Sequence, residues 1–355
     1  MKIRRATDRY EAWLGRHVSL VAADLRRKHA EMRTAVFPFL RATYYRWAQR
    51  WPKACKSLAA APRVLAVGDL HVENFGTWRD AEGRLVWGIN DFDEAWRLPY
   101  TNDLVRLATS AFLAIDEGHL GLAPEAAAAA ILDGYRDALG AGGRALVLTE
   151  RHHELRAMAT ARLHNPTAFW KKLQELPGAR GRIPSRVLKT LQRALPEPNL
   201  PHRVARRVGG LGSLGHPRFV AIAEWHGAQI VREAKALGPP ASVWAAGGSG
   251  KVDLAYEKIL RRSIRCPDPF VAVTRGWLVR RLAPDCARIE LGALPKERDE
   301  VRLLTAMGWE TANVHLGTSE ARGLRQDLGR RHRGWLLDAA QAMVQSSIVP
   351  ASLVS

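Results

Sequence analysis

Cysteine is scarce in this sequence, and no apolar run is long. The three cysteines, Cys55, Cys266 and Cys286, form no CxxC pair and no spacing typical of a metal site. We therefore expect no disulfide framework, but free buried thiols in a reducing compartment. No apolar run approaches the roughly 20 residues of a membrane helix, and "MKIRRATDRY" at the amino terminus has no apolar core behind it. The sequence predicts a cytoplasmic protein without a membrane span.

Acidic residues are also few compared with basic residues. The 35 acidic residues face 54 lysines and arginines, which gives a formal net charge of +19 and a pI near 10.6. Such a field attracts nucleotides, phosphorylated substrates, nucleic acid and acidic membrane surfaces without choosing among them. A solvated basic surface accounts for the charge equally well. An anionic substrate and a nucleic-acid partner both stay open on this basis.

The chain contains no internal repeat and no long low-complexity tract, and 47% of its 355 residues are hydrophobic. This is enough to bury a sizeable core and predicts two lobes. "LPEPNLPHR" at 195–203 carries three prolines and is typical of a hinge. We expect a helical lobe over residues 1–195, a β-rich lobe over 196–296, and C-terminal helices over 297–355 that return to the helical lobe.

The periodicity of apolar residues indicates an α+β fold. Short strands are predicted around 63–67 and 84–90, and "YYRWAQRW" at 44–51 spaces its aromatics like the buried side of a helix. Further helices are predicted over 101–117, 123–139, 251–264 and most of 297–346, and further strands over 202–208, 217–225, 228–237 and, as a hairpin, 270–282.

Polar side chains are dense where the first predicted strand ends, in "VGDLHVENFG" at 67–76. The second strand ends in "INDFDEAW" at 89–96, which contributes Asp91 and Asp93. If the two strands are neighbours, their ends form a cluster of oxygen ligands, as a hard cation such as Mg²⁺ requires. For either motif alone, the capping of a turn is as good an explanation as a metal site. For the two motifs together, turn capping is the weaker explanation.

The five-residue step from Asp69 to Asn74 equals that of the D-x-x-x-x-N loop of kinases. In such a site one Asp orients the attacking hydroxyl, while an Asn and a second Asp hold metal on the phosphates. "GDLHVENFG" and "INDFDEAWRLPYTNDLVRLATS" closely resemble the signature of a bacterial family known as domain of unknown function 2252. More distantly, they are similar to aminoglycoside and choline phosphotransferases of the kinase-like fold.

The kinase-like resemblance implies a role for each polar residue of these two loops. It makes Asp69 the catalytic base, Asn74 a metal ligand and Asp91 the principal metal ligand, with Asp93 counted in the same metal cluster. His71 matches a loop histidine of the pattern and is given a supporting role, because a single histidine is more often a hydrogen-bonded scaffold than a proton shuttle. Asp103 matches a later aspartate of the pattern and is expected to brace the loop.

"GLGSLG" at 210–215 fits G-x-G-x-x-G and precedes a predicted strand, which favours the hairpin that covers ATP phosphates in kinases over a dinucleotide fold. A plain glycine-rich hairpin is the alternative. Arg232 stands where a kinase has its phosphate-binding lysine, so we expect Arg232 to point into the cleft and Lys235, three residues on, to face away. Glu257 is its expected helix partner. The predicted nucleotide-binding residues are Gly210, Gly212, Ser213, Gly215, Arg232 and Glu257.

The glycine-rich loop follows the acidic loops, the reverse of the kinase order. The resemblance therefore implies a circularly permuted, two-lobed kinase-like fold, with the catalytic loops in the helical lobe and the nucleotide in the β-rich lobe. The implied function is an ATP- and Mg²⁺-dependent phosphotransferase acting on an unidentified hydroxyl, with nucleotidyl transfer less favoured. The alternatives are a pseudokinase-like nucleotide-binding regulator, suggested by Arg232, and a basic nucleic-acid-binding protein without catalysis, which is less favoured.

Overall fold

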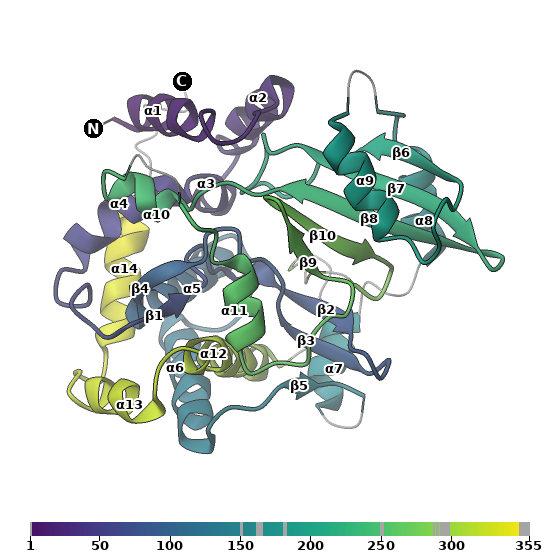
Figure 1. Ribbon diagram of the computed structural model, residues 1–355. Coiled ribbons are helices and arrows are strands. Elements are labelled where there is room, and N and C mark those ends of the chain that lie inside the picture. Colours follow the sequence, from purple (N-terminus) through teal and green to yellow (C-terminus); the bar gives the residue numbers. More distant parts are fainter. Residues whose placement is uncertain are drawn as a thin grey trace.

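The computed structural model describes residues 2–149, 152–160, 166–179, 183–248, 252–286, 288, 291 and 299–347. These residues form fourteen α-helices and ten strands in three antiparallel sheets. The largest sheet lies to one side and most of the helices lie to the other (Figure 1). The predicted α+β class is confirmed. Among the described residues, no helix is long and apolar enough to cross a membrane.

The largest sheet has five antiparallel strands in the order β6-β7-β8-β10-β9. Tight turns join β7 to β8 at His226 and Gly227, and β9 to β10 at Arg275 and Gly276; all four residues have positive φ angles, as two-residue hairpin turns require. The strands predicted from the sequence, including the last hairpin, are confirmed. Their bounds are β6 (His202–Arg206), β7 (Arg218–Trp225), β8 (Ala228–Ala236), β9 (Ala272–Thr274) and β10 (Trp277–Leu282).

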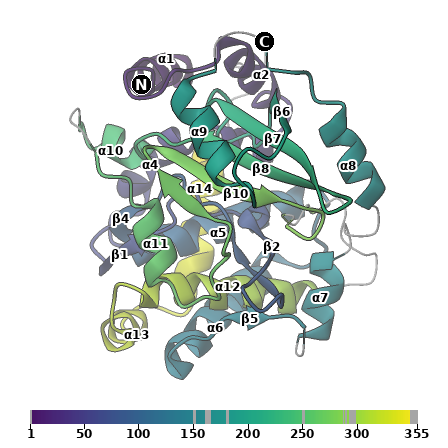
Figure 2. The same ribbon diagram turned by 45° about the vertical axis from the view of Figure 1, so that its right-hand side comes forward.

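Two helices cover opposite faces of this sheet, α8 (Pro166–Gln174) and α9 (Ser185–Arg193) (Figures 1 and 2). Leu173 of α8 packs with Val231 of β8 in a small apolar core. On the other face, the end of α9 contacts Arg232, whose Nε donates to the carbonyl oxygen of Ala194 at 2.9 Å. Successive side chains of a strand point to opposite faces, so β8 divides its charged residues between the two.

The helical part is built around α5 (Tyr100–Asp116), α6 (Pro124–Ala141) and α12 (Glu300–Leu316), with α13 (Ala321–Gly329) and α14 (Trp335–Ser347) beside them. Helices α6 and α12 pack closely because each presents a glycine to the other. A Cβ atom on Gly134 would overlap the carbonyl oxygen of Thr305, and one on Gly308 would overlap that of Ile131. The C-terminal helices thus lie against helices from the first half of the chain.

We expect Gly134→Ala and Gly308→Ala to lower the free energy of unfolding by ~1–3 kcal/mol or more, since the added methyl group forces two backbones apart. Gly140→Ala is the matched control. It lies in α6 as well, with no atom within 4 Å of a Cβ, so it should gain up to about 1 kcal/mol from helix propensity. Denaturant unfolding measures all three. Equal effects at the three positions would contradict the close helix contact.

Two small sheets carry the acidic loops. β1 (Arg63–Ala66) pairs with β4 (Trp96–Pro99), whereas β3 (Leu85–Ile89) lies between β2 (Phe75–Arg79) and β5 (Leu146–Val147). The expectation that the strands before the two loops are neighbours in one sheet is therefore wrong. The loops meet for another reason. The first loop leads into β2 and the second leaves β3, so the β2–β3 pairing brings them together, and the Asn90 N–H donates to the Asn74 carbonyl at 2.9 Å.

The amino-terminal helices lie beside the glycine-rich turn between β6 and β7. The Val21 N–H donates to the Gly215 carbonyl at 2.8 Å, and Asp24 pairs with Arg206 at 2.5 Å. Helix α4 buries its aromatic side, as its spacing predicted. The remaining helices are α1 (Ile3–Leu14), α2 (Ala22–Glu31), α3 (Val36–Ala42), α4 (Tyr44–Ala54), α7 (His153–Thr160), α10 (Ala241–Ala245) and α11 (Tyr256–Arg262).

Candidate functional site

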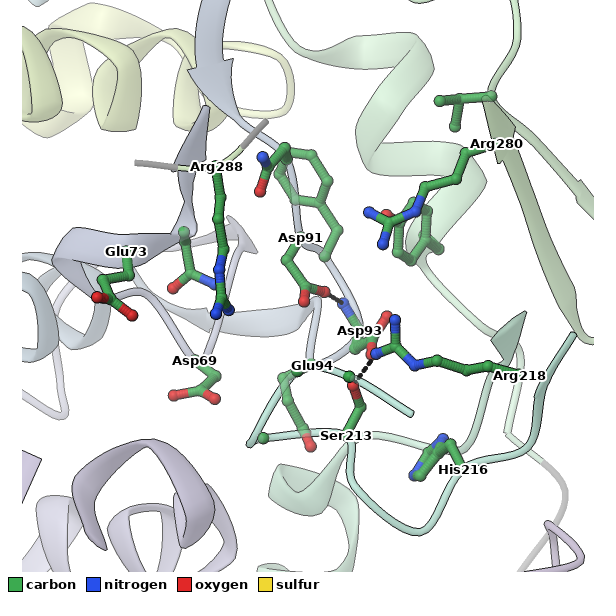
Figure 3. A pocket seen from close by; sticks show the side chains of 18 of the residues that line it. Asp69, Glu73, Asp91, Asp93, Glu94, Ser213, His216, Arg218, Arg280 and Arg288 are labelled. Carbon is green, nitrogen blue, oxygen red and sulfur yellow. Dashed lines mark hydrogen bonds between the residues drawn. The ribbon is translucent and has the colours of Figure 1, made fainter. Parts of the chain in front are cut away.

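A cavity of about 1120 Å³ lies between the five-stranded sheet and the two acidic loops. Both loops line it, and so does the glycine-rich turn, although this turn follows the two loops by more than 100 residues in the chain. Figure 3 shows Asp69 and Asp91 on one side of this space, with Arg218 and Arg280 on the other. The structure thus brings the two predicted motifs into one cavity.

Asp103 of α5 fixes the backbone of the first acidic loop by hydrogen bonds. Its carboxylate accepts the backbone N–H groups of Val67 at 2.6 Å and Gly68 at 3.0 Å, and His315 Nε2 lies 3.0 Å from it. Gly68 has a φ of +84°, and a Cβ there would overlap the Glu94 carbonyl oxygen of the second loop. The prediction that Asp103 braces the loop is confirmed.

Asp69 faces the cavity with a buried cation behind it. Arg106 of α5 donates through Nε at 3.1 Å and through Nη2 to Asp69 Oδ1, and its guanidinium stacks 4.8 Å from the Trp47 ring. Burial raises the pKa of Asp69, although Arg106 opposes the rise. The sequence reasoning missed Arg106. A single arginine in the otherwise apolar helix "DLVRLATSAFLA" was the signal that a buried partner existed.

His71 and Asn74 close a short 3₁₀ turn, η1 (Val72–Asn74). The His71 N–H donates to Asn74 Oδ1 at 2.7 Å, and the Glu73 N–H donates to His71 Nδ1 at 3.2 Å. Burial, together with Arg41 and Arg106, holds the pKa of His71 well below its usual range. A neutral ring that accepts a backbone hydrogen bond acts as a scaffold, which agrees with the supporting role predicted for His71.

Asp91 and Asp93 of the second loop share one cation, Lys235 of β8. Its Nζ lies 2.5 Å from Asp93 Oδ2 and 3.5 Å from Asp91 Oδ1, and the lysine side chain is almost fully buried. Burial opposes ionisation of Asp91, but Lys235, Arg280 and Arg218 outweigh it and bring its pKa to about 2. Burial and the Asp91 charge raise the pKa of Asp93 to about 6. The second carboxylate thus holds its proton more readily than the first.

The predicted orientations of Arg232 and Lys235 are wrong, because the structure reverses them. Lys235 faces the cavity, whereas Arg232 contacts the end of α9 and lies 4.7 Å from the Phe270 ring on the opposite face of the sheet. The prediction that the two side chains point to opposite faces of the strand was correct, but the choice of which one faces the cavity was wrong. Glu233 and Lys235, two residues apart, share the face of β8 that points toward the cavity, and alternation by itself does not identify this face as the cavity side.

The glycine-rich residues form the turn of the β6–β7 hairpin, as predicted. A Cβ on Gly212 would lie 3.5 Å from Asp69 Oδ2, so this turn covers the first acidic loop. Arg218 Nη2 donates to Ser213 Oγ, and Gly210 lies beside the same guanidinium. Gly215, with a φ of +102°, instead packs against Leu25 of α2.

Glu257 of α11 lines the cavity but does not act as a partner of the strand cation. It pairs with Arg261 at 3.9 Å, and both side chains are exposed. The expected pairing of Glu257 with Arg232 is therefore wrong, because Arg232 lies on the other face of the sheet. Lys235 takes its carboxylates from the second acidic loop instead.

Two further charged residues adjoin the loops of the site: Lys28, which the sequence reasoning missed, and Glu94 of the second acidic loop, to which the sequence reasoning gave no separate role. Lys28 of α2 donates from Nζ to the Gly212 carbonyl at 3.2 Å, and its side chain is only 5% exposed. Glu94 accepts the Ala241 N–H at 2.6 Å, and burial raises its pKa to about 8. Glu94 belongs to the second acidic motif, "INDFDEAW", whereas Lys28 belongs to no motif, so only the folded chain identifies Lys28.

The magnesium ion that the resemblance implies needs oxygen ligands. Asp93 Oδ1 is buried without a hydrogen-bond partner, and the Asp91 carboxylate is its neighbour. Asn74 Oδ1 accepts one hydrogen bond and keeps a second lone pair. In the described part of the chain, no group of three or more His, Cys, Asp or Glu could hold a metal by itself. The residues fit an ion that completes its shell with water and phosphate oxygens.

His216 ties the glycine-rich turn to β8, since its Nδ1–H donates to the Ala236 carbonyl at 2.9 Å. Burial, with help from Lys235 and Lys28, lowers the pKa of His216 to about 4. Between about pH 6.5 and 4 the unfolded state then binds the extra proton, so stability falls as the pH falls. Denaturant unfolding should show that His216→Gln removes a slope of at most about 1.4 kcal/mol per pH unit in this window. Parallel curves for the two proteins would contradict the buried neutral ring.

The fold and the site define an α+β protein with paired carboxylates and a buried lysine beneath a glycine-rich hairpin. Residues 20–190 match the family model described as "Uncharacterized protein conserved in bacteria (DUF2252)". For this part of the chain, the resemblance to domain of unknown function 2252 is confirmed. No curated protein and no solved structure matches the chain. The kinase-like resemblance therefore stays a prediction.

Proposed function

We propose that the protein is an ATP- and Mg²⁺-dependent phosphotransferase built on a permuted kinase-like fold and acting on a hydroxyl substrate. One observation carries the proposal: the buried Lys235 reaches Asp91 and Asp93, and these two carboxylates line the same cavity as Asp69 and the glycine-rich turn. The strand order supports it, because the glycine-rich turn joins β6 to β7 and the lysine lies on β8, the order in which kinases place these parts.

Each residue has a defined task in this proposal. Asp69 accepts the proton of the substrate hydroxyl. The hydroxyl oxygen bonds to the terminal phosphorus of ATP while the bond from that phosphorus to the leaving nucleoside diphosphate breaks. Lys235 holds phosphate oxygens, and residues of the glycine-rich turn line the same space. Asp91, Asp93 and Asn74 would hold the magnesium ion, which supplies positive charge to the phosphates. Asp103 and Arg106 fix the position of Asp69.

The two alternative functions, a pseudokinase-like regulator and a nucleic-acid-binding protein, have less support than the sequence alone gave them. A pseudokinase-like regulator was suggested by an arginine in place of the phosphate-binding lysine, but a lysine occupies the cavity face of β8. A nucleic-acid-binding protein would not need paired carboxylates around a buried lysine. Both remain outcomes of the test.

Calorimetric titration with ATP, in the presence and absence of Mg²⁺, tests the proposal. We expect Mg²⁺-dependent binding that Asp91→Ala removes, because the variant loses a metal ligand. Binding without ATP turnover on any hydroxyl substrate would favour the regulator. Absence of binding at millimolar nucleotide would overturn the enzyme, and salt-dependent retention on DNA or RNA would then favour the nucleic-acid-binding protein.

A further inference from the structure

Beside Lys235, the cavity face of the five-stranded sheet carries further charged side chains. Strand register places Arg218 of β7 directly opposite Lys235, and Arg280 of β10 directly opposite Glu233. Directly opposed residues point to the same face, so these four side chains form one patch toward the cavity. Figure 3 shows Arg218 and Arg280 extending toward Asp91 and Asp93.

Glu233 is the centre of this patch and is fully buried. Arg207 Nη1 lies 2.5 Å from its Oε1, Arg280 Nε lies 2.7 Å from its Oε2, and Arg218 Nη1 lies 3.6 Å from Oε2. Burial opposes ionisation of Glu233, but the three arginines outweigh it and hold its pKa well below the usual range. Glu233 is therefore a carboxylate that serves as an internal anion for three guanidinium groups.

One carboxylate cannot satisfy three arginines. The three arginines carry two more charges than Glu233, and Asp91 and Asp93, whose two carboxylates share the single Lys235, offset only one of them. Arg218 is 4% exposed, yet its Nε has no hydrogen-bond partner. Leaving a buried charged donor unsatisfied is costly, so a site of this kind is suited to an anion that enters from the cavity.

The chemistry of the patch selects the class of anion. Guanidinium groups present planar pairs of donors that match phosphate oxygens, whereas a nucleobase is bound mainly by apolar and aromatic surfaces. We propose that Arg207, Arg218 and Arg280, arranged around Glu233, form a phosphate-binding site next to the position of the transferred phosphoryl group. The bound phosphate belongs either to the polyphosphate chain of the donor or to the acceptor. Only the position next to the transferred phosphoryl group rests on the proposed function; the phosphate-binding site itself does not.

Calorimetry with inorganic tripolyphosphate in the absence of Mg²⁺ tests this site. Arg280→Gln and Arg207→Gln, at partly exposed positions, should each weaken binding about tenfold or more. Arg275→Gln, in the exposed turn before β10, is the matched control for net charge and should change binding less than about twofold. Equal tripolyphosphate affinity in all three variants, with lower melting temperatures for the first two, would show a structural ion network and overturn the proposal.

Competition with Mg-ATP identifies the source of the phosphate. If saturating Mg-ATP excludes tripolyphosphate, the site holds the donor's phosphates, and if both bind together it holds a phosphate of the acceptor. The two proposals fail separately. Tripolyphosphate binding that depends on Arg280, in a protein that binds no Mg-ATP, would overturn the phosphotransferase and leave the phosphate site. Mg-ATP turnover without tripolyphosphate binding would overturn the phosphate site alone.

Discussion

Lys235→Met should lower kcat/KM for ATP by on the order of a thousandfold, and Mg-ATP binding should weaken strongly. The substitution keeps the length of the side chain but removes the ammonium group that lies between Asp91 and Asp93. Two effects combine: the phosphate oxygens lose their cation, and the neighbouring carboxylates of Asp91 and Asp93 lose the charge that offsets their repulsion. Calorimetry measures the loss of Mg-ATP binding, and steady-state kinetics measures the loss of kcat/KM.

Arg232→Met is the control for this prediction, since it removes a cation three residues away on the same strand. Its guanidinium faces α9 and Phe270, so nucleotide affinity should stay within about twofold of the unsubstituted protein, with some loss of stability from the lost packing. A larger loss of binding in Arg232→Met than in Lys235→Met would contradict the assignment of the cavity face.

Asp69→Asn should reduce turnover by about a hundredfold to ten-thousandfold while Mg-ATP binds with nearly unchanged affinity. The amide is similar in size to the carboxylate but cannot accept the hydroxyl proton. Rapid-quench or coupled assays give the rate, and calorimetry gives the affinity.

Asp69 also neutralises Arg106, which is 1% exposed, so the amide could act through stability alone. Asp69→Glu keeps the negative charge for Arg106 but moves the carboxylate, and it should lose turnover as well. Comparable loss of folding stability in both variants, with nucleotide affinity falling in parallel, would show that Asp69 only holds the turn.

The fold class and most elements follow from local patterns. Alternating apolar residues in "PRFVAIAEW" and "AQIVREAKAL" are enough for β7 and β8, and the aromatic spacing of "YYRWAQRW" is enough for the buried side of α4. Pairing between strands is not local. β1 finds its partner in β4 through the packing of the intervening elements, and no residue in either strand specifies it.

The site was predicted where its chemistry is concentrated in short motifs, as in Asp69, Asn74 and Asp91. The groups that hold it, Arg106, Lys28, Arg218 and Glu233, come singly from α5, α2, β7 and β8. Which face of β8 meets the cavity depends on where α8 and α9 dock. Alternation gives the two faces of a strand but not the environment of each, and for this reason Arg232 was chosen over Lys235.

Titration of ATP into the protein, followed by calorimetry with and without Mg²⁺, tests the central claim most directly. If the two acidic loops, Lys235 and the glycine-rich turn form one nucleotide site, one ATP should bind per chain, and binding should require Mg²⁺. No heat of binding at millimolar ATP with Mg²⁺, from a folded sample, would contradict the account.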